Sequence, residues 1–92
     1  MRIRWSFAAR SDLVRLRDFL KPVNPPAAAR VARSLQSAPA RLLLDNPRLG
    51  VRLDAIASRE VRRLFVDDYE LRYEIQGDTI IVVRLWHTKE DR

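Results

Sequence analysis

The sequence predicts an α+β fold in which a helical hairpin covers one face of a mostly antiparallel sheet. Apolar residues recur every three or four positions in the first half of the chain, as in amphipathic helices. In the second half they alternate with polar residues or form short apolar runs, as in strands. A chain of 92 residues can hold one modest core, so residues 1–92 are expected to form a single domain.

The first half should contain a short strand and a first helix. Residues 2–6 alternate in polarity with Ile3 and Trp5 on one face, and Ser6 is a suitable N-cap for a helix. Spacings of four, three and four residues then give an apolar stripe formed by Ala9, Leu13, Leu16 and Leu20. The charged residues expected on much of the remaining helix surface are Arg10, Asp12, Arg15, Arg17 and Asp18. Pro22 should end this helix.

Pro25 and Pro26 open a second helix, because proline is well tolerated in the first turn. Its apolar stripe is formed by Ala28, Val31, Ala32 and Leu35. Pro39 predicts a kink or a break, and Asn46-Pro47 ends the helical half. Only a few residues join the two helices, so they should pair as an antiparallel hairpin.

The second half should form a three-stranded antiparallel meander. Residues 61–66 read as a first strand, and residues 79–86 are apolar on both faces, as in a central strand. Between them, apolar Tyr69, Leu71, Tyr73 and Ile75 alternate with Glu70, Arg72, Glu74 and Gln76, which predicts a half-buried strand. Turns are expected at Asp67-Asp68 and at residues 76–78.

The composition limits the functions to consider. The net charge is +6 and arginine supplies nearly all of the positive charge, which favours a nucleic acid or an acidic protein as partner. A biased base composition of the genome is an equally simple reason for so many arginines. Cysteine is absent and His87 is the only histidine, so neither a disulfide, a zinc site nor a cofactor is expected. No apolar run approaches the roughly 20 residues of a membrane span, and no secretion signal is seen, so the expected compartment is the cytoplasm.

Several local signatures occur in order along nearly the whole chain. They are Trp5-Ser6 with Asp12-Leu13; Leu43, Pro47 and Gly50; and the segments 60–64, 69–73 and 83–92, the last ending in Trp86-His87-Thr88-Lys89. Together they resemble toxins of the RelE/ParE superfamily, the growth-arresting members of type II toxin–antitoxin systems. This resemblance implies a cognate antitoxin, expected to be acidic, that binds as an amphipathic helix or an added strand in a hetero-oligomer.

The resemblance favours the ParE-like branch, which implies inhibition of DNA gyrase by a protein without catalytic residues. The alternatives are a ribosome-dependent messenger-RNA endonuclease of the RelE type, a member that only binds its antitoxin, or an unrelated basic binding module. Many ribonuclease members have arginine at the position of Glu70, where a carboxylate would repel the scissile phosphate. Direct contact with nucleic acid is expected only for the RelE-like alternative.

For an endonuclease, the candidate catalytic residues are His87, Arg84, Arg62 and Lys89. Those expected to bind a protein partner are Arg62, Arg63, Arg72, Arg84, Trp86 and His87. Each has a structural alternative. His87 could end a strand and hydrogen-bond the backbone, and Arg62 and Arg63 could form a solvated pair. The aromatic residues Trp5, Tyr69, Tyr73 and Trp86 could simply pack in the core.

Overall fold

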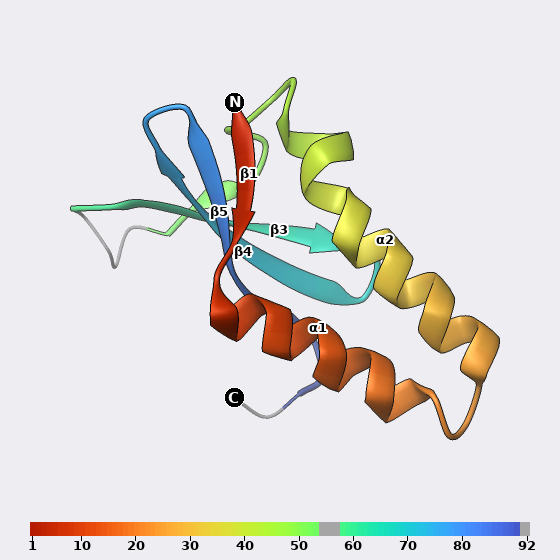
Figure 1. Cartoon of the computed structure of the whole chain (residues 1–92). Helices are drawn as coiled ribbons and strands as arrows, with labels where there is room; N and C mark the ends of the chain where they lie inside the picture. Colours follow the sequence, from red (N-terminus) through yellow and green to blue (C-terminus); the bar gives the residue numbers. More distant parts are fainter. Residues whose placement is uncertain (54–57, 91–92) are drawn as a thin grey trace.

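The structure, a computed structural model, describes residues 1–53 and 58–90 and has the predicted α+β architecture (Figure 1). Its elements are β1 (Arg2–Trp5), α1 (Phe7–Leu20), α2 (Pro25–Leu43), β2 (Val51–Arg52), β3 (Glu60–Val66), β4 (Tyr69–Gln76) and β5 (Thr79–His87). The sheet order is β1-β5-β4-β3-β2, with β1 parallel to β5 and the other neighbours antiparallel. Strand β2 was not predicted, because two residues are too few to show an alternating pattern.

The first helix begins at its predicted cap, Ser6, and the second begins at the predicted Pro25, with Asn24 as a cap that was not predicted. Ser6 Oγ accepts a hydrogen bond from Ala9 N at 3.0 Å, and Asn24 Oδ1 caps α2 in the same way at 3.1 Å. The helix does not break at Pro39, because this proline costs one main-chain hydrogen bond near the end of α2 while its ring is fully buried. No helix in the described part of the chain is both long and apolar enough to cross a membrane.

The hydrophobic core lies between the helical hairpin and one face of the sheet (Figure 1). Its buried members are Ala9, Leu16, Leu35, Ala38, Leu43, Val66, Leu71, Tyr73, Ile80, Val82 and Leu85. Trp5 and Tyr69 pack against this cluster, so the predicted core packing of these two residues and of Tyr73 is confirmed. Each fully buried leucine contributes about 2 kcal/mol through the hydrophobic effect.

Tyr73 also holds the loop between α2 and β2. Its hydroxyl donates a hydrogen bond to Pro47 O at 2.7 Å and accepts one from Gly50 N at 2.9 Å. A Cβ atom on Gly50 would lie 2.6 Å from Arg63 O and 2.8 Å from the tyrosine hydroxyl, so only glycine allows this close approach. Burial raises the pKa of Tyr73, and its two hydrogen bonds to the backbone make this phenol a structural group.

A β-bulge between β4 and β5 decides which side chains face the helices. Arg72 is opposite Arg84 and Tyr73 is opposite Val82, so Val83 of β5 has no partner on β4. Without this extra residue, Arg84 would follow Val82 onto the core face. With it, Leu85 takes the core position and Arg84 moves to the face that the helices leave open.

Candidate functional site

The open face of the sheet carries arginines stacked on aromatic rings. The guanidinium carbon of Arg72 lies 4.7 Å from the ring centroid of Trp86, and that of Arg84 lies 5.7 Å from it. On β3, Arg63 covers Phe65 at 5.5 Å. Trp86 is buried, as predicted, with 7% of its surface exposed. Its cover is formed by the long arginine side chains rather than by the helices.

The same face buries two carboxylates that the alternation of β4 placed in solvent. Glu70 is 2% exposed and Glu74 is 4% exposed, so the prediction of a polar face in contact with water is wrong for both. Arg72 Nε donates to Glu70 Oε2 at 2.9 Å, and Arg59 Nε donates to Glu74 Oε2 at 3.0 Å. The hydrogen bonds from Arg59 outweigh the effect of burial and hold the pKa of Glu74 below its ordinary value.

Side chains of α1 complete the hydrogen bonding of the β5 edge. β1 pairs only with the first part of β5, so the remainder of that edge faces α1. Asp12 Oδ2 accepts a hydrogen bond from Leu85 N at 2.9 Å, and Arg15 donates to Leu85 O at 3.1 Å. Ser6 Oγ donates to Val83 O at 3.0 Å. These three side chains take the place of a neighbouring strand.

The expectation that Asp12 lies on the surface of α1 is wrong, because it is 4% exposed. Burial raises the pKa of this carboxyl, but hydrogen bonds from Arg84 and from Leu85 N outweigh that effect, and the pKa is lowered. Arg84 contacts it through two nitrogens, at 2.7 and 3.2 Å. Asp12 follows Ala9 by three residues and precedes Leu16 by four. That spacing lies within the apolar stripe and could have indicated burial.

His87 ends β5 and lies on the helix side of the sheet. Its Nδ1 accepts a hydrogen bond from Lys89 N at 3.1 Å. Its ring packs edge-on against Tyr69, with centroids 5.1 Å apart and planes at 87°. This is the arrangement of a strand-end residue that binds the backbone. Burial also raises the pKa of the Tyr69 hydroxyl, which makes it a poor base at neutral pH.

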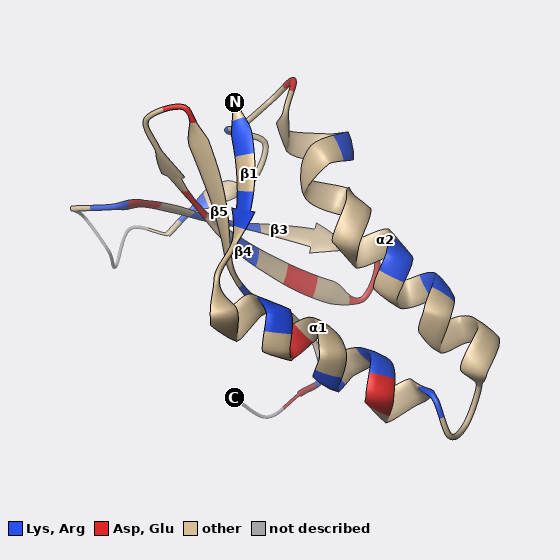
Figure 2. Cartoon of the chain, in the orientation of Figure 1, with Lys and Arg blue, Asp and Glu red and all other residues tan. Residues whose placement is uncertain are grey.

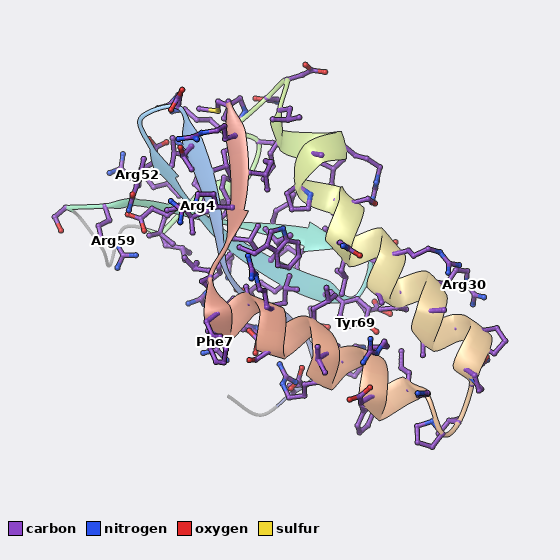
Figure 3. The ribbon with its side chains drawn as sticks, in the orientation of Figure 1. Arg4, Phe7, Arg30, Arg52, Arg59 and Tyr69 are labelled. Atoms are coloured by element: carbon purple, nitrogen blue, oxygen red, sulfur yellow. The ribbon has the colours of Figure 1, made fainter. Side chains whose placement is uncertain are left out.

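A cavity of about 470 Å³ lies beside His87 and the second half of α1. Its apolar lining comes from Leu16, Phe19, Leu20 and Tyr69, and the charged side chains of Arg15, Lys89 and Glu90 also line it. Phe19, in the lining of this cavity, is 80% exposed, and Phe7 and Val23, at the start of α1 and just after its end, are 86% and 85% exposed. Figure 3 shows Phe7 pointing away from the sheet at the start of α1.

The structure does not bring the four candidate catalytic residues together. His87 and Lys89 lie at the end of β5, whereas Arg84 lies on the open face and Arg62 lies on β3. The β3 residue level with His87 is Val66, four positions from Arg62. That places the arginine roughly 13 Å away along the strands and roughly 10 Å across them.

Arg62 is also committed to contacts of its own. Its side chain is 15% exposed, and its Nε donates to Glu60 Oε2 at 2.9 Å. A second nitrogen donates to Gly50 O at 2.8 Å, so Arg62 helps to hold the loop before β2. Hydrogen bonds from Arg48 and Arg62 lower the pKa of Glu60, so this ion pair stays charged to a lower pH than an unpaired glutamate would.

The residues predicted to bind a partner divide between the two faces of the sheet. Arg63, Arg72, Arg84 and Trp86 share the open face, as their opposed positions and ring contacts show. Arg62 and His87 are opposite Tyr73 and Tyr69, so they lie on the helix side. The structure therefore assembles four of the six residues into one basic, aromatic surface.

The chain is similar in sequence and in fold to known proteins. Residues 3–92 match the family model of the ParE toxin of the type II toxin–antitoxin system parDE. The chain is 34% identical over 83 residues to Toxin RelE2 of Caulobacter vibrioides, covering 90% of both proteins. A chain of the chromosomal ParDE system from P. aeruginosa has the same fold, with a TM-score of 0.74, 16% identity and 95% of each chain covered. The chain therefore belongs to the ParE toxin family of type II toxin–antitoxin systems.

Proposed function

We propose that this toxin acts in the cytoplasm as a binding protein that inhibits DNA gyrase, and not as a messenger-RNA endonuclease. The observation that carries this proposal is that the arginines available for catalysis are dispersed and already paired with carboxylates. Arg84 is bound to Asp12, and Arg62 to Glu60. The choice of gyrase rests on membership of the ParE family, and the choice against RNA cleavage rests on this geometry.

RNA cleavage requires a base for the 2′-hydroxyl, an acid for the leaving oxygen and cations for the developing phosphorane charge. His87 could supply one of the two proton transfers, but the candidate arginines do not converge on it. Moving Arg84 onto a phosphate would also remove a charged partner from Asp12, whose side chain is 5% exposed. Leaving a buried carboxylate without such a partner is costly.

The open face suits an acidic region of a protein target. Arg63, Arg72 and Arg84 surround Trp86 and Phe65 on a surface that both helices leave uncovered. Arginine and tryptophan are the side chains that most often dominate the binding energy of protein interfaces. We assign contact with the target to this face.

The antitoxin is proposed to bind a different surface, formed by α1 and the cavity beside His87. Phe19 is exposed next to that cavity, and Lys89 adds positive charge to its lining, whereas Arg15 there is paired with Asp12 and Glu90. An acidic amphipathic segment could place an apolar side chain in the cavity and a carboxylate near Lys89. The toxin would then be held inactive in a hetero-oligomer with its antitoxin.

The test of the toxic mechanism is to induce this chain alone in growing bacteria and follow DNA and protein synthesis by pulse-labelling. We expect DNA synthesis to fall first, with a DNA-damage response, and toxicity to survive His87→Ala. Early loss of protein synthesis, together with loss of toxicity in His87→Ala, would instead establish the endonuclease. Continued growth would identify a member that only binds its antitoxin.

The antitoxin surface is tested by calorimetric titration with the protein encoded beside the toxin gene. Phe19→Asp should weaken binding by about 30-fold or more, the effect of losing a central aromatic anchor. Phe65→Asp is the matched control, because it introduces the same change at an exposed phenylalanine on the open face. Equal weakening by both variants would contradict the assignment to α1.

A further inference from the structure

The outward face of α2 carries arginines with no acidic residue among them. Arg30, Arg33 and Arg41 are exposed, and the sequence of α2 contains neither aspartate nor glutamate. At 100° per residue they fall within an arc of about 80°, and they span about 16 Å of the helix axis. Figure 2 shows α2 with positive charge only, and Figure 3 shows Arg30 projecting from it into solvent.

Contacts within α2 draw these positive charges together. Arg41 Nε donates to Ser37 Oγ at 2.9 Å, and its terminal nitrogen donates to Ser34 O at 3.0 Å. The guanidinium group of Arg41 is therefore folded back along the helix toward Arg33 and Arg30. Among the described residues, none of these three arginines forms an ion pair, although Arg62, Arg72 and Arg84 of the sheet do. The like charges remain available to an external anion.

We propose that this α2 arginine face, formed by Arg30, Arg33 and Arg41, binds a nucleic-acid duplex through its phosphate groups. Between the arginines the surface is made of small or polar side chains, such as Ser37 and Ala40. Arginine and serine are common donors to phosphate oxygens. The face thus presents an electrostatic contact that needs no particular base sequence.

The surroundings of these arginines argue against the other classes of partner. Stable protein interfaces contain central aromatic or large apolar anchors, which the exposed surface between Arg30 and Arg41 lacks. Single-stranded nucleic acid is usually bound by stacking its bases on aromatic rings, and α2 contains no aromatic residue. A duplex, by contrast, presents phosphates while its bases stay stacked. The surface of α1 differs from this face, because it exposes two aromatic side chains, those of Phe7 and Phe19.

This inference goes beyond the proposed function and does not depend on gyrase as the target. It would give the toxin a second, weaker contact wherever its protein target already holds DNA. Two linked contacts increase the apparent affinity, because the second one becomes intramolecular. Failure of the gyrase proposal would leave the duplex contact intact, and the reverse also holds.

The test measures binding of the purified chain to short labelled DNA and RNA duplexes by fluorescence anisotropy over a range of salt concentrations. The variant is the triple substitution Arg30→Gln, Arg33→Gln and Arg41→Gln. The matched control is Arg2→Gln, Arg10→Gln and Arg52→Gln, which removes the same charge from other exposed positions. The α2 variant should lower the slope of log affinity against log salt by about 2 to 3, since each phosphate contact contributes about 0.9. The control should change it by less than about 1.

Comparing the affinities for the DNA and RNA duplexes shows which of the two the α2 arginine face prefers. Equal decreases of the salt slope in the two triple variants would overturn the proposal, because general attraction by net charge would then explain the binding. Tighter binding of single strands than of duplexes would overturn it too. So would an α2 variant that binds duplexes normally but loses its antitoxin, because this face would then be a protein interface. Far-ultraviolet circular dichroism checks that both variants are folded.

Discussion

The two faces of the sheet are buried in different ways. On the helix side, Leu71 and Tyr73 are fully buried by the packing of α1 and α2. On the open side, Glu70 and Trp86 are almost as inaccessible, but arginine side chains cover them. The hydrophobic effect stabilises the first face. Ion pairs and cation–π contacts stabilise the second, and their net contribution is smaller because the charged groups lose hydration.

This difference shows that an arginine on a sheet can be structural and accessible at the same time. Arg72 both neutralises Glu70 and covers Trp86, while its side chain remains 35% exposed. A partner that binds the open face must therefore preserve this cover or replace it. An acidic target could preserve the cover by pairing with Arg63, which forms no ion pair among the described residues, and leave Arg72 bound to Glu70.

The largest expected effect concerns the helix-covered face. Leu71→Ala should lower the free energy of unfolding by about 3 kcal/mol, because it removes buried methyl groups and leaves a cavity. Phe65→Ala on the open face should cost less than about 1 kcal/mol, since half of that side chain is already exposed. Urea denaturation monitored by circular dichroism measures both. If both substitutions lowered the free energy of unfolding by similar amounts, the two faces would not be stabilised in different ways.

A smaller effect is expected when the arginine cover of the open face is reduced. Arg72→Gln should lower the free energy of unfolding by about 1 kcal/mol, because Glu70 loses a charged partner and Trp86 part of its cover. The double variant with Glu70→Gln should recover part of this loss, since the buried charge is then removed. A double-mutant cycle in the same denaturation assay gives the coupling. Strict additivity would show that the ion pair does not stabilise this face.

The smallest effect is expected from acid. The pKa of Asp12 is lowered in the folded protein, so its ion pair stabilises the fold above the ordinary value of 3.8. This stabilisation is lost as the pH falls through the lower, folded-state value. Asp12→Asn should therefore flatten the fall in stability between about pH 5 and about pH 3, measured by urea denaturation at each pH.

The sequence predicted the features that depend on neighbouring residues. Helix periodicity, the cap at Ser6 and the end of α1 before Pro22 all follow from local rules, and the structure confirms them. The turns between the meander strands also lie where predicted, with Asp67 and Gly77 in left-handed conformations at φ 53° and 59°. The order of all elements except β2 was therefore accessible without knowledge of tertiary contacts.

What the sequence could not predict depends on residues far apart in the chain. The helical spacing of Asp12 could have indicated its burial but not its partner, Arg84, which lies 72 positions later and reaches it across the edge of β5. Glu70 and Glu74 leave water because arginines cover them, although an alternating pattern places them in solvent. The bulge that moves Arg84 to the open face has no local signature either. These features, which the sequence did not predict, lie in or beside the candidate site. Residue types alone had suggested that the site residues form a single cluster.

The closure of the β5 edge by Ser6, Asp12 and Arg15 also protects the protein against self-assembly. An exposed strand edge can recruit the edge of another molecule and begin a growing fibre. Beyond β1, the hydrogen-bonding groups of β5 at Val83 and Leu85 are occupied by helix side chains, so a second sheet cannot be added at these positions. The toxin released from its antitoxin is thus protected from strand addition at this edge, and a change that removes the acceptor oxygen of residue 12, such as Asp12→Ala, would leave Leu85 N open to another strand.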